Sequence, residues 1–480
     1  MSGLARIGAP GRHVYDVIVV GTQLSGLLAG ALLAKRGCAV LLAPVSTEPQ
    51  EYELDQLRLP SLPDVFEPAL SIPLLAEVAA ELALTQILQR EVPLMAPQII
   101  LPRQRIALST DAAKTEKELA RVWPGEAAAI QARWNKARSV ASADDAAIAS
   151  RPPIPAAGWW SRFLMNRRLK RLEWSGADFA LNPAHALDAA VTKMISHLGI
   201  ADAALSRSRV LARSFDALSV LPSGPAGLES LVRNRAREIG ADVTDLATTS
   251  LVFEGSAPIG IRLARNDTTF RAPVVIAACD TASLIPLLPE ERQRKAHQAW
   301  PENSAKHHFT VHAIIEPSAV PPGLADLALV PTDSDLGSVL ITVAPVQRID
   351  GKPTDDLRIS MSSQVPSAVI KGGAPTIKAT AERMWAAVDG VLPFVRKTAK
   401  RESVVASDAE KTTRTALSAP AENGVLGVTR YPIETPFNRL LLSNREVVPG
   451  LNLEGDVLAG LRVVERIEKL LKRQQKGKTS

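Results

Sequence analysis

The chain has 480 residues, 46% hydrophobic and 22% charged, which is long enough for two or three hydrophobic cores. Its formal net charge of +6 and few aromatic residues argue against nucleic-acid binding, and two cysteines cannot build a disulfide framework. No stretch approaches the roughly 18 uninterrupted apolar residues of a membrane span, and the N-terminus lacks a secretory apolar run, so we expect a cytoplasmic protein.

The first predicted unit is a strand, a glycine turn, a helix and a second strand. The apolar run Val17–Val20 ends at Gly21, a helical pattern follows to Lys35, and another apolar run begins near Ala39. This order is typical of a βαβ unit that binds a dinucleotide.

One glycine of the fingerprint G-x-G-x-x-G is replaced. Gly21 and Gly26 occupy the first and third positions, but Gln23 stands at the second, where the backbone normally approaches a pyrophosphate. The helix from Leu24 onward still offers its N-terminal amides to an anion.

The rest of the chain alternates between helical and strand-like segments, and we find no internal repeat. In chain order we expect a helix over Thr115–Val140 broken at Pro124, a hinge over Ser150–Gly158, a helix over Gly227–Gly240, a strand over Val274–Cys279, a strand over His307–Pro317, and a last helix over Leu453–Lys472. We interpret Cys38 and Cys279 as buried packing residues.

Three segments carry a resemblance to a known family. The segments Lys114–Ile130, Leu221–Leu288 and Thr435–Ile467 resemble the substrate domain, the middle and the final flavin motif of phytoene desaturase-like flavoproteins. These belong to the superfamily of amine oxidases and Rab GDP dissociation inhibitors. The resemblance spans nearly the whole chain.

The resemblance implies an α/β fold with a discontinuous Rossmann-like FAD-binding domain and an inserted α+β substrate domain. It assigns residues 14–113, 216–290 and 425–472 to the FAD-binding-type domain, 114–215 and 291–424 to the substrate domain, and 473–480 to a flexible tail. In active relatives FAD oxidises an apolar polyene or an amine, and the chemistry is that of the flavin.

The resemblance also implies a set of cofactor contacts. They fall on Gly21, Thr22, Gly26, Thr249, Pro449, Gly450 and Leu453.

Five positions depart from the family pattern: Gln23, Pro44, Asn444, Arg445 and Asn452. Pro44 stands where the family has an acid for the ribose hydroxyls, and proline offers no side-chain acceptor. Asn444 and Arg445 stand where relatives have glycine and a residue that contacts the ribityl chain.

Two functions remain open from the sequence. The first is a non-catalytic protein of this fold that binds FAD weakly or not at all and docks a protein partner or an apolar or lipid ligand. The second is an FAD-dependent oxidoreductase acting on a polyene or other apolar substrate, alone or in a hetero-oligomer. The sequence gives no basis for choosing His308, Arg430 or Tyr431 as a catalytic acid or base.

Two further patterns have alternative interpretations. The basic, aromatic segment Trp159–Trp174 fits either a membrane-surface or partner contact, or a surface helix with solvated arginines. On a strand, His308 and His312 would share one face and His307 the other, which favours ordinary strand histidines over a metal site.

Overall fold

The computed structural model describes residues 12–45, 51–60, 65–151, 163, 167, 185–198, 204–213, 217–221, 225–264, 266–301, 306–332, 334–350, 352–404, 416–417 and 427–478. Within this part of the chain, no helix is both long enough and apolar enough to cross a membrane.

A five-stranded parallel sheet joins segments that are far apart in the sequence. In spatial order its strands are β10 (Asp242–Val243), β2 (Val40–Ala43), β1 (Val17–Val20), β14 (Val274–Ala277) and β21 (Leu440–Leu442). All four residues of β1, β2 and β14 are buried, which explains their continuous apolar sequences. The sheet confirms the predicted discontinuous α/β fold.

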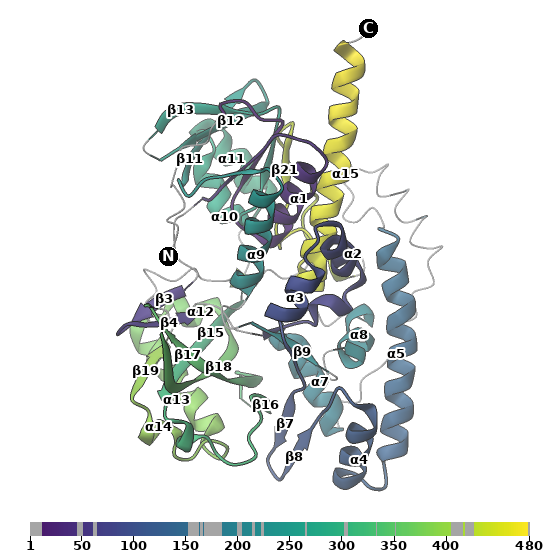
Figure 1. Ribbon diagram of the computed structural model, residues 1–480, viewed down its shortest axis with the longest axis vertical. Helices are drawn as coiled ribbons and strands as arrows, with labels where there is room; N and C mark the ends of the chain where they lie inside the picture. The colour runs from purple at the N-terminus through teal and green to yellow at the C-terminus, as the bar shows by residue number, and fades with distance from the viewer. Residues whose placement is uncertain are drawn as a thin grey trace.

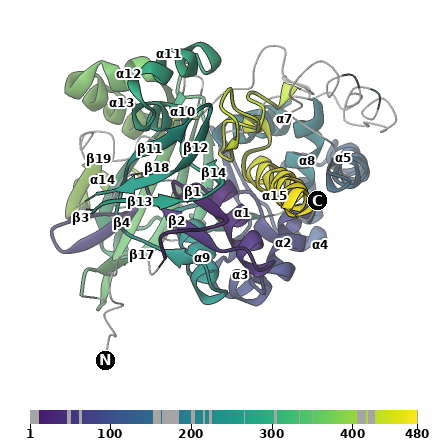
Figure 2. The same cartoon turned by 90° about the horizontal axis from the view of Figure 1, so that it is seen from above.

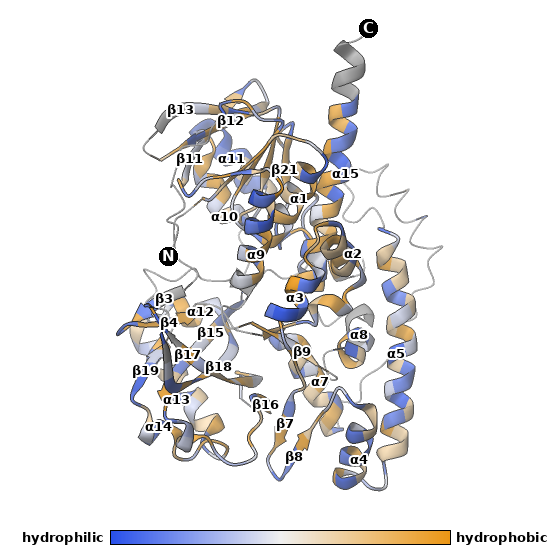
Figure 3. Ribbon diagram, viewed as in Figure 1, coloured by the Kyte–Doolittle hydropathy of each residue, from blue (hydrophilic) through white to orange (hydrophobic). Residues whose placement is uncertain are grey.

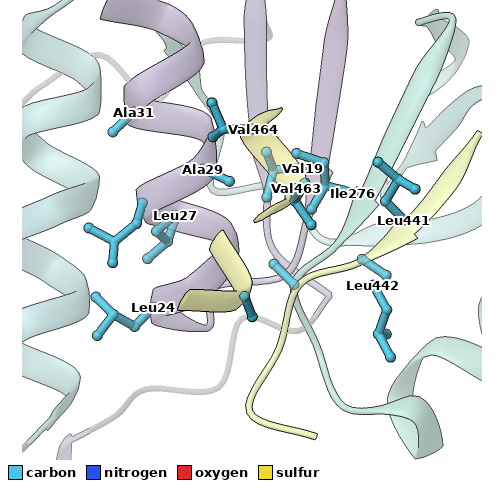
Figure 4. Close-up of a cluster of buried hydrophobic side chains, with 14 of the residues drawn as sticks. Val19, Leu24, Leu27, Ala29, Ala31, Ile276, Leu441, Leu442, Val463 and Val464 are labelled. Carbon is cyan, nitrogen blue, oxygen red and sulfur yellow. The ribbon is translucent and has the colours of Figure 1, made fainter. Parts of the chain in front are cut away.

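One face of this sheet is covered by helices that pack unusually closely. The helix α1 (Leu24–Lys35) contacts both α9 (Pro225–Glu238) and α15 (Asn452–Lys478), and every residue of α1 except Lys35 is buried. Figure 4 shows side chains of α1 beside Val463 and Val464 of α15 and against the strands. A Cβ added to Gly460 would lie 2.6 Å from the Ser25 carbonyl oxygen, so α15 can approach α1 this closely only without a side chain there.

The other face of the sheet meets a small antiparallel sheet. Its strands are β11 (Thr248–Glu254), β12 (Ala257–Leu263) and β13 (Asn266–Arg271), and β12 contacts β14. The short helix α10 (Thr281–Leu284) and α11 (Glu290–Ala299) follow β14 along the chain.

A ten-stranded, mostly antiparallel sheet forms the second half of the molecule, at the bottom of Figure 1. Its main path runs in the order β19 (Arg401–Val404), β15 (Lys306–Ile315), β18 (Pro353–Pro366), β17 (Ser338–Arg348), β16 (Leu327–Pro331), β7 (Gln98–Leu101) and β8 (Gln104–Ala107). Off this path, β20 (Ala416–Leu417) pairs with β15, β4 (Leu57–Pro60) pairs with β17, and β3 (Glu51–Leu54) pairs with β4.

Two of these segments differ from the sequence-based assignment. Residues 51–60 and 98–107 lie within 14–113, which we assigned to the FAD-binding-type domain, but their strands belong to the ten-stranded sheet. Their partners lie more than two hundred residues away, and local hydrophobic patterns carry no information about such distant pairing.

Helices pack on both faces of the ten-stranded sheet, as Figure 2 shows from above. On one face lie α12 (Ser367–Lys371), α13 (Gly373–Val388) and α14 (Val395–Thr398), and on the other lies the layer with α4 (Ala112–Val122), α5 (Ala127–Ala149), α7 (Ala186–His197) and α8 (Ala204–Arg213). The break between α4 and α5 confirms the predicted interruption at Pro124. A third small sheet, in the order β5 (Val65–Phe66), β9 (Leu218–Val220) and β6 (Leu94–Met95), and the helices α2 (Pro73–Glu81) and α3 (Thr85–Glu91) complete the described elements.

The last helix runs further than predicted. It continues to Lys478 and projects from the molecule, so residues 473–478 are helical. The lysine, arginine and glutamine residues of this stretch favour helix, and in Figure 3 the preceding turns of α15 alternate between hydrophilic and hydrophobic residues.

Candidate functional site

The strand order places a topological switch point between β1 and β14. From β1 the chain moves to β2 and β10 on one side, whereas β14 and β21 lie on the other side. In parallel sheets of this kind, ligands bind at the carboxyl ends of the strands at such a point. The relevant loops begin at Gly21, Ala278 and Ser443.

The turn after β1 depends on glycine for reasons of packing. Gly21 has a φ of +113°, and a Cβ added there would lie 2.2 Å from the Ala278 carbonyl oxygen. A Cβ added to Gly26 would lie 2.1 Å from the Ala278 Cβ. Both predicted glycines therefore let α1 and the turn lie directly against the end of β14, and Thr22 lies half-buried between them.

The side chain of Gln23 links this turn to the loop after β21. Its Oε1 accepts a hydrogen bond from the Arg445 backbone amide at 3.1 Å, while the Gln23 backbone amide donates to the Ala278 carbonyl at 2.9 Å. The Gln23 side chain therefore does not point away from the switch point. It spans the two loops at the place where the fingerprint would leave open backbone.

The loop after β21 is held by a buried network around Asn444. The Asn444 Nδ2 donates to the Cys279 carbonyl at 2.7 Å and to Glu446 Oε2 at 3.1 Å, and its Oδ1 accepts from the Glu446 amide at 3.0 Å. Glu446 Oε2 also accepts from the Thr281 amide at 2.6 Å. Both ends of the Asn444 amide are used in holding the loops together, so neither end points to a ligand.

In the described part of the loop after β2, Pro44 and Val45 offer a ribose no carboxylate. Pro44 has no polar side chain, and its carbonyl oxygen accepts from the Thr248 amide at 2.7 Å. The predicted contact residue Thr249 is exposed on β11, and its Oγ1 donates to the Arg262 carbonyl at 3.2 Å.

The turn before α15 is preserved as a structural feature. Pro449 and Gly450 form a short 3-10 turn with Leu451, and the Gly450 amide donates to the Val428 carbonyl at 2.9 Å. Asn452 follows with a φ of +42° and donates from Nδ2 to the Leu198 carbonyl at 2.7 Å. Asparagine tolerates positive φ better than most residues, so Asn452 keeps the turn and ties it to α7. The next residue, Leu453, is buried.

Arg445 lies where the two halves of the molecule meet. Its Nη2 is 3.7 Å from Glu229 Oε1 on α9, which is an ion-pair distance without a hydrogen bond. Its charge also acts on His308 of β15 and on Asp456 of α15. Burial raises the pKa of Asp456 to about 6, and the Arg445 charge offsets part of this rise.

Sequence reasoning missed Glu229, Asp456 and His197. Glu229 and Asp456 lie just beyond the first turns of α9 and α15, two helices that the sequence predicts, so their positions alone give no signal. His197 is the last residue of α7, and no sequence pattern marks it, because its place in the site depends on its neighbour His308 on β15.

The strand histidines follow the predicted alternation. His312 is buried, with Nδ1 2.8 Å from Ser360 Oγ and Nε2 3.1 Å from the Pro60 carbonyl oxygen, and burial lowers its pKa to about 3. His307 contacts Ser367 Oγ at 3.1 Å. Among the described residues, no group of histidine, cysteine and acidic side chains could hold a metal ion.

His308 is the strand histidine that reaches the junction. Its ring centroid lies 6.0 Å from that of His197, and burial lowers the pKa of His308 to about 3 and that of His197 to about 4. Both rings are therefore neutral at physiological pH. In contrast, Arg430 and Tyr431 hydrogen-bond to each other and to the Pro301 carbonyl.

The predicted interfacial segment Trp159–Trp174 lies outside the described residues, except for Phe163 and Arg167.

No family model matches the chain, and no curated protein matches its sequence. Solved structures do resemble it. An oxidoreductase from Methanosarcina mazei is 14% identical with a TM-score of 0.57, and the match covers 94% of this chain and 99% of that one. A putrescine oxidase variant from a redesign of cofactor binding is 18% identical with a TM-score of 0.55, covering 95% and 99%. A protein from Pyrococcus furiosus is 13% identical with a TM-score of 0.51, covering 94% and 97%. At these identities the likeness concerns the fold alone, and the chain therefore shares the α/β, Rossmann-like fold of these structures.

Proposed function

We propose that this chain keeps the flavoprotein fold without FAD as its resident cofactor and functions as a binding protein. The observation that carries the proposal is the hydrogen bond from the Arg445 amide to Gln23 Oε1, which joins two loops at the switch point. A dinucleotide in the usual pose needs that space for its pyrophosphate.

The other departures add to the same conclusion. Pro44 supplies no acceptor for ribose hydroxyls, and Asn444 uses its amide to hold Cys279 and Glu446. Displacing Gln23 would also leave the Arg445 amide without its present partner. An unpaired buried polar group costs about 1–3 kcal/mol, which corresponds to about a 5- to 150-fold loss of FAD affinity for each such contact. These residues do not fit FAD in the dinucleotide pose, so we derive no flavin chemistry from the site.

The bound species of this proposal is a protein partner or an apolar or lipid ligand, as the fold's use by Rab GDP dissociation inhibitors suggests by analogy. The finer resemblance to phytoene desaturases supports an apolar ligand in the same way. This resemblance is weaker support for the proposal than the contacts at the switch point.

One observation favours the alternative, an FAD-dependent oxidoreductase acting on a polyene or other apolar substrate. No described residue accepts from the backbone amides of Leu24, Ser25 and Gly26 at the start of α1. A helix N-terminus with open amides attracts phosphate, so a flavin held in an altered pose would find one favourable contact there.

Cofactor occupancy separates the two functions. The native protein is purified, its visible absorbance spectrum is recorded, heat-released flavin is quantified against protein, and the protein is then titrated with FAD. We expect no flavin band in the purified protein and only weak binding of added FAD. A flavin released in near-stoichiometric amount would overturn the proposal and support the oxidoreductase.

A further inference from the structure

The guanidinium of Arg445 has hydrogen-bonding capacity that the described residues do not use. Its Nε is buried and has no hydrogen-bond partner among them, and its contact with Glu229 is at 3.7 Å. A guanidinium carries five N–H donors in a planar fork that matches a carboxylate or a phosphate. Leaving such a donor buried and unpaired is costly, so it points to a group that completes it.

Three other polar side chains near Arg445 have the same property. Asp456 Oδ1, His197 Nδ1 and His308 Nδ1 are buried without hydrogen-bond partners in the described part of the chain. Asp456 comes from α15, His197 from the end of α7 and His308 from β15, so three separate elements contribute.

The orientation of His197 is fixed by the sheet behind it. Its Nε2 is 3.2 Å from Ser362 Oγ, and its backbone carbonyl accepts from Gln364 Nε2 at 3.2 Å. The Asn452 side chain holds the neighbouring Leu198 carbonyl at 2.7 Å. Because these contacts position the imidazole from one side, Nδ1 is the nitrogen left for another group.

We propose that Arg445, together with His197, His308 and Asp456, binds the oxyanion group of a small ligand, a carboxylate or a phosphate, at the junction of the two large sheets. The inference rests on the proposed function, because a resident FAD would compete for the same junction.

The hydrogen-bond donors at the junction fit an oxyanion. Arg445 supplies a positive charge and a planar donor fork, and neutral His197 and His308 can each donate an N–H to an oxygen, whereas Glu229 and ionised Asp456 oppose an anion. Burial raises the pKa of Asp456 to about 6, so the protonated carboxyl that can donate a hydrogen bond becomes accessible in mildly acidic solution. The N-terminus of α1, joined to Arg445 through Gln23, adds partial positive charge.

Size separates this ligand from a dinucleotide. The Gln23–Arg445 hydrogen bond and the Asn444 network stay in place in the proposed complex, so the ligand needs no opening of the loops. The oxyanion itself can belong to a carboxylate or to a phosphate, and the two are distinguished by experiment.

The test is calorimetric titration at constant ionic strength with two probes, benzoate for a carboxylate and inorganic pyrophosphate for a phosphate. The variants are Arg445→Met, which removes the guanidinium, and Arg445→Lys, which keeps the charge but loses the planar fork. Arg233→Met is the matched control, because the Arg233 side chain is 27% exposed against 26% for Arg445 and also pairs with an acid.

We expect at least one probe to bind the wild type, and Arg445→Met to weaken it by about 10- to 100-fold, the effect of losing hydrogen bonds to a charged group. Arg445→Lys should also weaken binding, which keeps the test decisive if Arg445→Met does not fold. Arg233→Met should change affinity by about twofold at most, because Arg233 contacts Asp245 and the Thr244 carbonyl rather than the groups of the proposed site.

Two results would overturn the inference: neither probe binds, or Arg233→Met weakens binding as much as Arg445→Met does. Parallel titration with FAD keeps the two proposals separate. Absence of probe binding without FAD binding removes only the oxyanion site, whereas tight FAD binding removes the proposed function whatever the probes do.

Discussion

The substitution Gln23→Gly restores the missing glycine of the fingerprint and tests whether one side chain excludes FAD. Gln23 has a φ of −65° and a ψ of 143°, which glycine adopts without strain. The variant loses the hydrogen bond to the Arg445 amide, about 1–3 kcal/mol, and gains unfolded-chain entropy worth about 0.5–1 kcal/mol. We therefore expect a loss of about 1.5–4 kcal/mol in the free energy of unfolding, measured by urea denaturation.

The same substitution should improve FAD binding. Opening the backbone removes the need to displace a bonded side chain, and we expect about a 10- to 100-fold gain in affinity over the wild type by titration. Gln23→Glu is the control, because its carboxylate keeps an acceptor at the same reach and places negative charge at the N-terminus of α1, where it repels phosphate. Equal FAD affinity in the wild type and in Gln23→Gly would refute the reasoning, as would a gain in Gln23→Glu.

Three further predictions concern stability. Gly26→Ala should lower the free energy of unfolding by about 1–3 kcal/mol, because the new Cβ would meet the Ala278 Cβ at 2.1 Å; urea denaturation that shows no change would contradict this. Burial raises the pKa of Glu67 from 4.5 to about 7, so its cost is absent below pH 4.5, grows as pH rises and is complete above pH 7. Glu67→Gln should therefore match the wild type at pH 4 and be more stable by about 3 kcal/mol at pH 8, and a pH-independent difference would exclude this cause. Asn452 has a φ of +42°, so Asn452→Ala should be less stable than Asn452→Gly by about 1–3 kcal/mol in the same denaturation assay.

The fold was predictable from the sequence because the local hydrophobic patterns agree with the helices and strands that form. The apolar run Val17–Val20, the glycine at Gly21 and the helix that follows are all recovered, and all lie at the centre of one buried core. The assignment of residues 51–60 and 98–107 failed for the opposite reason. Strand partners elsewhere in the chain decide which sheet those strands join, and no local pattern indicates which sheet that is.

The sequence indicated which positions form the candidate site, but not which of these residues contact one another. The sequence indicates that Gln23, Asn444 and Arg445 differ from the family pattern, yet it does not indicate that Gln23 bonds to the Arg445 amide. It also misses that His197 and His308 lie close together, because α7 and β15 are brought together only by the packed sheet.

The fingerprint residues that remain, Gly21 and Gly26, are therefore weaker evidence for FAD binding than the motif alone indicates. Gly21 and Gly26 each have a packing reason that needs no ligand, since any side chain at either position would collide with Ala278. The middle glycine and the ribose acid have no comparable structural reason, because the chain accommodates Gln23 in an extended conformation and Pro44 beside Thr248. Asn452 differs, because its φ of +42° belongs to a turn that the fold requires, and asparagine keeps that turn. Gly21 and Gly26 are therefore kept where the fold requires glycine, whereas Gln23 and Pro44 stand at positions that only the dinucleotide requires. This division supports the proposed binding function, and it makes Arg445, rather than the glycine turn, the residue on which a ligand search should begin.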